Sequence, residues 1–271
     1  MPGRRAVGAG SSRSPLILLP PSEGKTAPSR GAALSLPGLS SPSLNPAREA
    51  VLDALVSLCT DSPDLAMDVL GIPKTQPALV AANAALRTAA TARADRVYTG
   101  VLYDALGFET LSPAARRRAT RGVMVTSSLF GLVSPADRIP AYRLSGDAVL
   151  PGLGGVAAHW RGHLGPALLE AVGSGLLVDL RSGMYGAFWR PPADLRVATV
   201  RVLHEVAGTR KVVSHFNKAT KGRIVRALLE SGAAPRTPAR LAEALADLGW
   251  TVEAGPASGA GSQLDVVVAE L

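Results

Sequence analysis

Lysine is rare in this sequence, and its positions indicate where an anion could bind. Only five lysines occur, at positions 25, 74, 211, 218 and 221, and the other basic residues are arginines. Lys218 and Lys221 stand beside Gly222 and Arg223, at the start of a helix expected over residues 220–231. Side chains three residues apart share a helix face, and cations at a helix start oppose its dipole. A bound anion would offset that cost, so this cluster favours an anion-binding site.

A second candidate lies in the sequence PSEGKT (21–26), where Glu23 stands near Lys25 after an apolar run. A P-loop requires a glycine five positions before its Gly-Lys pair, and Leu19 occupies that position here. The sequence therefore argues against a Walker-type nucleotide site. What remains is a loop that presents an acid and an amine. They form either a simple ion pair or an acid–base or nucleophilic site.

A third candidate is the turn that contains Gly71 and Lys74, between helices expected over 63–70 and 77–92. Backbone N–H groups at the start of a helix can bind a phosphate oxygen. Helix–hairpin–helix modules hold DNA in this way, without reading its bases. The same pattern also fits an ordinary corner between two helices, and one glycine and one lysine do not decide between them.

Metal and redox chemistry have little support in the sequence. His159 and His163 are four residues apart on an expected helix, but no nearby pattern supplies a third ligand. We therefore expect no metal site and no cofactor. Cys59 is the single cysteine, which excludes a disulfide within the chain and fits a reducing cytosol. Most of the few aromatic residues are expected in the core.

Composition indicates a folded α/β protein with a basic surface. Of 271 residues, 47% are hydrophobic, which is enough to bury a sizeable core, and the net charge is +8. No apolar run has the length of a membrane span, and no secretory signal is recognisable. We expect residues 1–14 to form a disordered basic tail and residues 15–271 to form the domain, in the cytoplasm.

The order of the expected elements predicts an α+β fold, a single compact domain with a mixed sheet. Strands and helices alternate irregularly, with several hairpins, which argues against a regular doubly wound sheet. The expected strands cover 16–19, 123–126, 176–180, 195–203, 211–215, 250–253 and 264–269, and further helices cover 46–59, 113–121, 156–172 and 238–248.

Several segments together resemble the YaaA family of peroxide stress proteins. They are ILLPPSEGK (17–25), VYTG (97–100), SSLFGLVSPADRIPAYRL (127–144), HW (159–160) and SHFNKATKGR (214–223). Their order and spacing match the family, and separate motifs in register are more specific than any one alone. The resemblance implies a cytoplasmic bacterial protein with the mixed YaaA-like fold. It also implies a DNA-binding cleft with a helix–hairpin–helix element, and a role in limiting iron-driven peroxide damage.

The resemblance assigns the candidate anion-binding residues by position. Lys25 corresponds to the lysine after the first strand, and Tyr142-Arg143 matches a PYRL-like motif in which Ala141 replaces the proline. The full set for nucleic acid or another anion is Lys25, Gly71, Lys74, Arg143, Lys218, Lys221, Gly222 and Arg223. The family implies no established catalytic activity.

Three functions remain open from the sequence. The first is a DNA-binding stress protein that grips backbone phosphates, with steep salt dependence. The second is an enzyme acting on a small phosphorylated or carboxylated substrate, with Lys25, Glu23 or Lys221 as the reactive group. The third, direct iron binding, lacks a convincing ligand set. The partner predicted from the first is DNA, bound with low sequence specificity.

Overall fold

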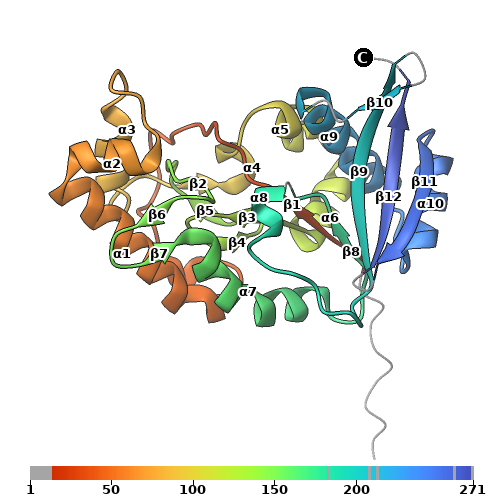
Figure 1. Cartoon of the computed structure of the whole chain (residues 1–271), viewed down its shortest axis with the longest axis horizontal. Helices are drawn as coiled ribbons and strands as arrows, with labels where there is room; N and C mark the ends of the chain where they lie inside the picture. Colours follow the sequence, from red (N-terminus) through yellow and green to blue (C-terminus); the bar gives the residue numbers. More distant parts are fainter. Residues whose placement is uncertain (1–13, 182, 207–208, 212–213, 259–260, 270–271) are drawn as a thin grey trace, which may run out of the picture.

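The computed structural model describes residues 14–181, 183–206, 209–211, 214–258 and 261–269. Its centre is a mixed eight-stranded sheet (Figure 1). Seven strands follow the order β11-β12-β9-β8-β1-β3-β4, and β10 pairs with β9. The strands are β1 (Leu16–Leu19), β3 (Val123–Ser127), β4 (Gly131–Val133), β8 (Leu177–Asp179), β9 (Val197–Val206), β10 (Thr209–Lys211), β11 (Thr251–Ser258) and β12 (Gly261–Val268).

The middle of the sheet is parallel, and its strands are buried. β1 pairs in parallel with β3 and β8, and β9 pairs in parallel with β8 and β12. All four residues of the run LILL in β1 are buried, as expected for a strand covered on both faces. The outer pairs β3–β4, β11–β12 and β9–β10 are antiparallel. Because β1, β3 and β8 run in the same direction, their carboxyl ends meet at one edge.

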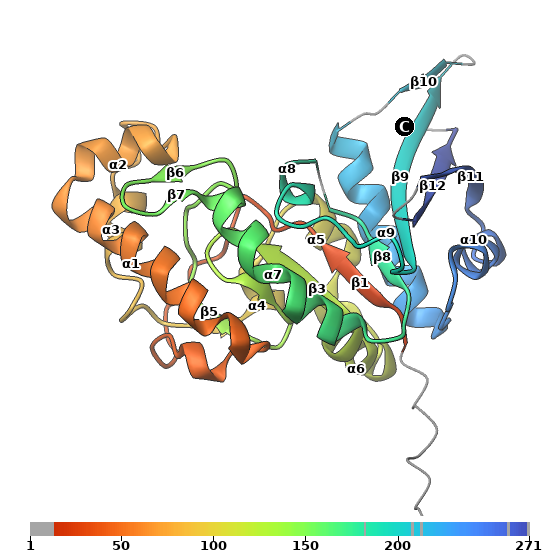
Figure 2. The ribbon, with the colours of Figure 1, turned by 60° about the horizontal axis from the view of Figure 1, so that its bottom comes forward.

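Helices surround this sheet and extend the molecule along its long axis. In both views α1–α3 lie at one end, while β9, β12 and α10 lie at the other (Figures 1 and 2). The helices are α1 (Asn45–Asp61), α2 (Pro63–Leu70), α3 (Ala78–Ala84), α4 (Ala94–Val97), α5 (Val101–Leu106), α6 (Pro113–Gly122), α7 (Val156–Val172), α8 (Gly183–Gly186), α9 (Ser214–Ser231) and α10 (Pro238–Asp247). In the described part of the chain, three short 3₁₀ turns cover Leu36–Gly38, Pro42–Leu44 and Phe108–Thr110. Two small strand pairs there lie outside the main sheet: β2 (Ala92–Arg93) pairs with β5 (Arg138–Ile139), and β6 (Val149–Leu150) pairs with β7 (Gly154–Gly155).

The predicted mixed sheet is confirmed, but the helix that carries Lys218 and Lys221 begins earlier than predicted. α9 begins at Ser214, six residues before the predicted start, so Lys218 and Lys221 lie beyond its first turn. The field of a helix end falls off within that turn. The electrostatic cost that we inferred for these cations is therefore wrong. Residues 1–13 of the predicted tail lie outside the described residues.

The predicted helix–hairpin–helix element is not confirmed. α2 forms as expected, but α3 ends at Ala84 instead of near residue 92, and residues 92–93 pair with β5. The turn amides are also already used. The N–H of Gly71 donates to the Asp68 carbonyl oxygen at 3.3 Å and that of Ile72 donates to the Met67 carbonyl at 2.8 Å. These two amides cap α2 and are not free to hold a phosphate.

Gly222 has a packing role where α9 crosses α5. A Cβ atom at this position would lie 2.2 Å from the carbonyl oxygen of Leu102 and 2.9 Å from the Cβ of Ala105. No side chain fits at such distances without moving the backbone. We had assigned Gly222 to anion binding. Its buried position against α5 explains the glycine by helix packing instead.

A fully buried arginine, Arg48, connects α1 to the chain that follows β3. Arg48 of α1 donates through Nε to the Phe130 carbonyl at 2.9 Å and through Nη2 to the Leu132 and Ser40 carbonyls at 2.8 and 2.7 Å. Burial lowers its pKa to about 10, although the charge of Asp137 opposes this. A buried cation with so many acceptors fixes the chain after β3.

Candidate functional site

Two of the predicted residues, Lys25 and Lys221, lie at the carboxyl edge of β1, β3 and β8. Lys25 follows β1, Ser127 ends β3, and Leu180 follows β8. The strands are in register, and the N–H of Leu180 donates to the carbonyl of Leu18 at 2.9 Å. Crevices outside the carboxyl ends of parallel strands are the usual ligand sites of open α/β sheets. This edge is the candidate functional site.

Lys25 is the centre of the site. Its Nζ donates to the Ser22 carbonyl at 2.9 Å and, at 3.5 Å, to the Glu23 carbonyl. The same atom lies 4.1 Å from the ring centre of Tyr142 and 5.6 Å from that of Tyr98. Part of the residue reaches solvent, but the amine is surrounded by protein atoms. It makes no ion pair with any described carboxylate.

This environment disfavours the charged form of the amine. The pKa of Lys25 is lowered to about 7: burial is the largest cause, the positive charge of Arg143 also lowers it, and the charge of Glu23 partly opposes both. At neutral pH a large fraction of the amine is therefore uncharged. An amine in this state can act as a base or as a nucleophile.

A chain of hydroxyl groups lies beside the amine. The Tyr142 hydroxyl is 2.8 Å from the Ser127 hydroxyl and 3.0 Å from the Tyr98 hydroxyl. Burial raises the pKa of Tyr98 and Tyr142, so both keep their protons at neutral pH. Tyr103 donates to the Pro20 carbonyl at 2.7 Å and stacks on Tyr98. The site therefore contains hydrogen-bond and proton donors fixed in place.

Arg143 is anchored by its backbone. The buried side chain of Asn83 on α3 donates to the Arg143 carbonyl at 2.7 Å and accepts from its N–H at 2.9 Å. The guanidinium makes no hydrogen bond or ion pair with a described side chain or carbonyl. An arginine with a fixed backbone and a free guanidinium is suited to binding a carboxylate or phosphate.

Lys221 reaches the same edge from α9. Its Nζ donates to the Leu180 carbonyl at 2.9 Å, and burial lowers its pKa while the charge of Asp179 raises it. Asp179 itself pairs with the buried Arg181 at 2.7 Å. Arg181 also donates to the Tyr185 carbonyl at 3.1 Å, which fixes α8 beside the site.

The other predicted residues lie apart from this edge or on its outside. Lys218 and Arg223 are exposed on α9, and their side chains make no hydrogen bond or ion pair within the described part of the chain. Gly71 and Lys74 are exposed in the turn between α2 and α3. In Figure 1 these two helices and α9 lie on opposite sides of the sheet centre. Glu23 is exposed and lies near Lys25, since its charge raises the pKa of that amine.

The described residues offer no metal centre. No group of three His, Cys, Asp or Glu side chains within them is arranged to hold an ion. The Nε2 of His159 is hydrogen-bonded to the Ala47 carbonyl at 3.0 Å, and the Nδ1 of His163 to the His159 carbonyl at 2.7 Å. These contacts use one ring nitrogen of each histidine for local structure. No described helix is long and apolar enough to cross a membrane.

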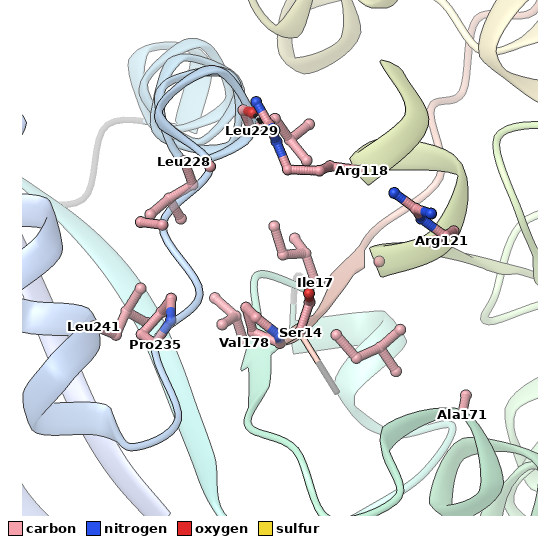
Figure 3. A pocket seen from close by; sticks show the side chains of 15 residues that line it. Ser14, Ile17, Arg118, Arg121, Ala171, Val178, Leu228, Leu229, Pro235 and Leu241 are labelled. Atoms are coloured by element: carbon pink, nitrogen blue, oxygen red, sulfur yellow. Dashed lines mark hydrogen bonds between the residues drawn. The ribbon is translucent and has the colours of Figure 1, made fainter. Parts of the chain in front are cut away.

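A cavity of about 410 Å³ lies at the opposite edge of the sheet (Figure 3). Side chains from α6 and α9 surround it together with Ile17 of β1 and Val178 of β8. Its walls are both apolar and polar, with Arg118 and Arg121 on the side of α6. Arg118 donates to the Leu229 and Glu230 carbonyls at 2.7 and 3.1 Å, so it caps the end of α9. None of the predicted site residues lines this cavity.

Comparison with known proteins agrees with the motifs. The family profile described as peroxide stress protein YaaA matches residues 16–255. This chain belongs to that family. A UPF0246 protein of Streptomyces coelicolor is 55% identical over 260 residues, which cover 94% of this chain and 99% of that protein. A UPF0246 protein of Corynebacterium efficiens is 44% identical over 240 residues, covering 88% of this chain and 94% of that protein.

In this YaaA-family chain, several site residues were not among the sequence predictions. Tyr98, Tyr103 and Ser127 line the edge but were assigned to the core or only quoted within a motif. The pair Asp179–Arg181 was also missed. The sequence did carry a signal for three of them: Ser127 and Asp179 end apolar strands of the parallel sheet, and Arg181 follows one. The hydrogen bond between Tyr98 and Tyr142 joins segments 44 positions apart, which no local pattern predicts.

Proposed function

We propose that this member of the peroxide stress family is an enzyme that acts on a small anionic substrate at the carboxyl edge. The proposal rests on one observation: the amine of Lys25 is enclosed, forms no ion pair with a described carboxylate, and has its pKa lowered by burial and by the charge of Arg143. The Lys25 amine is surrounded by protein atoms and lies over the Tyr142 ring, a position that suits a backbone phosphate of duplex DNA poorly. A small molecule with a carboxylate or phosphate fits the enclosed position better.

The roles of the residues follow from their contacts. Arg143 binds the anionic group, since its guanidinium is unpaired and its backbone is fixed by Asn83. Lys25 supplies a base or nucleophile at neutral pH. The hydroxyls of Tyr142 and Ser127 donate protons or hydrogen bonds to groups that gain negative charge. This is a set of donors around one amine, as acid–base chemistry requires.

DNA binding is a second candidate, supported by a different observation. Lys218 and Arg223 are exposed on α9 and have no acidic partner among the described residues. Together with the resemblance to YaaA motifs, this supports contacts to backbone phosphates. Such contacts would weaken steeply with salt, because each neutralised phosphate releases counterions.

One pair of variants separates the two functions. Lys25→Met removes the amine, whereas Lys218→Ala with Arg223→Ala removes the exposed cations and leaves the enclosed site intact. The variants are introduced into a bacterial strain that lacks its own YaaA-family protein, and survival after hydrogen peroxide is measured beside DNA affinity of the purified proteins. The enzyme proposal expects Lys25→Met to lose protection and retain DNA affinity.

The opposite pattern would contradict the enzyme proposal. If Lys25→Met cells survive peroxide as well as wild-type cells, the amine has no part in the function. If the double variant on α9 loses both DNA affinity and protection while Lys25→Met keeps both, DNA binding is the function. Circular dichroism of each variant confirms that the loss does not come from unfolding.

A further inference from the structure

The contacts of the Lys25 amine leave its lone pair available. Nζ has two carbonyl oxygens and two aromatic rings around it, and no described carboxylate forms an ion pair with it. A lysine held for its charge alone is normally paired, because an unpaired buried cation is costly. The neighbouring Glu23 and Gly24 are exposed, so the loop that carries Lys25 lies at the surface of the protein.

We propose that Lys25 forms an imine with an aldehyde or ketone whose carboxylate or phosphate is held by Arg143. The inference rests on the enzyme function proposed above and names its substrate class. Imine chemistry requires an uncharged amine, an oriented carbonyl group and a proton donor. In the described site Lys25 is the candidate amine, Arg143 would orient the substrate that brings the carbonyl group, and Tyr142 is the candidate proton donor.

The step balances with the groups present. The nitrogen lone pair of Lys25 attacks the carbonyl carbon, the C=O π electrons move to the oxygen, and one proton passes from the nitrogen to that oxygen to give a neutral carbinolamine. The hydroxyl group then leaves as water after a second proton is delivered, and the nitrogen lone pair forms the C=N bond of a protonated imine. Water reverses the sequence and releases the amine. No electrons are gained or lost, and no oxidant is required.

The hydroxyl chain supplies the protons. Nζ lies over the Tyr142 ring, whose hydroxyl is bonded to those of Ser127 and Tyr98. Because burial keeps these tyrosines protonated at neutral pH, they donate protons and do not compete as bases. The ionisable groups that act on the amine are Arg143, which favours the uncharged form, and Glu23, which opposes it.

Reductive trapping tests the proposal on the full chain. The protein is incubated at pH 7 with glyceraldehyde 3-phosphate or glyoxylate and sodium cyanoborohydride, which reduces an imine to a stable secondary amine. Peptide mass spectrometry then locates the adducts. Lys218 is the matched control, because it is an exposed lysine on α9. At pH 7 an amine of pKa about 7 is about a thousandfold richer in the uncharged form than an ordinary lysine.

We expect at least tenfold more adduct at Lys25 than at Lys218 at pH 7. Adduct formation at Lys25 should reach half its maximal rate near pH 7. Tyr142→Phe should slow trapping at Lys25 at least threefold without changing Lys218. Arg143→Gln should lower trapping of glyceraldehyde 3-phosphate more strongly than trapping of uncharged glyceraldehyde, because the first loses both the anion contact and the effect of the Arg143 charge on the amine, and the second loses only the charge effect.

Adducts spread over the exposed lysines, with none enriched at Lys25, would overturn the imine proposal. A second measurement separates this result from failure of the enzyme function itself. Glycerol 3-phosphate has the anion but no carbonyl group, and a bound ligand raises the melting temperature. If it stabilises wild type but not Arg143→Gln while Lys25 is not trapped, the anion site stands and only the imine is refuted. If neither trapping nor stabilisation is seen, both proposals fail.

Discussion

Replacing Lys25 with methionine should stabilise the fold, because the native structure holds this amine away from its preferred charge. Its pKa falls from 10.5 to about 7 through burial, with a further contribution from Arg143. One pKa unit is worth about 1.4 kcal/mol, so the amine costs roughly 4 kcal/mol of folding free energy at pH 7. Methionine has a similar length and no charge.

The expected gain is smaller than this cost. The variant loses the hydrogen bond to the Ser22 carbonyl and the contact with the Tyr142 ring, each worth about 1 kcal/mol. The net stabilisation expected for Lys25→Met at pH 7 is therefore about 2 kcal/mol. Urea denaturation followed by circular dichroism measures it, and Lys218→Met is the control, expected within about 0.5 kcal/mol of wild type.

The pH dependence gives the prediction a second readout. Between about pH 7 and 10.5 the unfolded chain binds a proton at Lys25 that the native chain does not, so wild-type stability rises with pH in this window. The advantage of Lys25→Met should therefore be about 3 kcal/mol smaller at pH 9.5 than at pH 7. If Lys25→Met is destabilised by the same amount at both pH values, Lys25 is a structural cation and the reasoning is refuted.

Three further outcomes follow from the packing and the surface. Gly222→Ala should destabilise the protein by about 1–3 kcal/mol in urea denaturation, because its Cβ would overlap the carbonyl of Leu102; no loss would contradict the tight crossing of α5 and α9. Arg48→Met should cost about 3 kcal/mol or more, since it leaves buried carbonyls unsatisfied; calorimetry showing an unchanged melting temperature would refute this. If DNA is bound through α9, Lys218→Ala with Arg223→Ala should reduce the log–log salt slope of DNA affinity by up to about 2; an unchanged slope would exclude these contacts.

The sheet was predictable where strands are apolar runs or hairpins. LILL marked β1, and the Gly/Ser segment between two strand patterns marked the β11–β12 hairpin. The end of α3 was not predictable from propensity, because the alanine-rich sequence favours a longer helix. Tertiary contacts end it there. Thr91 donates through its N–H to the Ala32 carbonyl and accepts at its own carbonyl from Arg138.

The candidate site was predictable only in part. Lys25 was found because an amine and an acid follow a strand, and Arg143 was found from a motif. The tyrosine hydroxyl chain was missed, because it depends on the order of strands in the sheet and not on local spacing. The packing of Gly222 against α5 was not predictable, because a glycine inside a basic cluster has the same local pattern whether it approaches an anion or a neighbouring helix.

The state of the Lys25 amine can be measured directly by NMR. With ¹³C-labelled lysine, the chain gives Cε signals from five lysines, and the Lys25→Met spectrum assigns the one of interest. We predict that the Lys25 signal titrates with a midpoint near 7. If Lys25 titrates above 10, as an ordinary lysine does, its amine stays charged at neutral pH and the proposed chemistry at this edge is wrong.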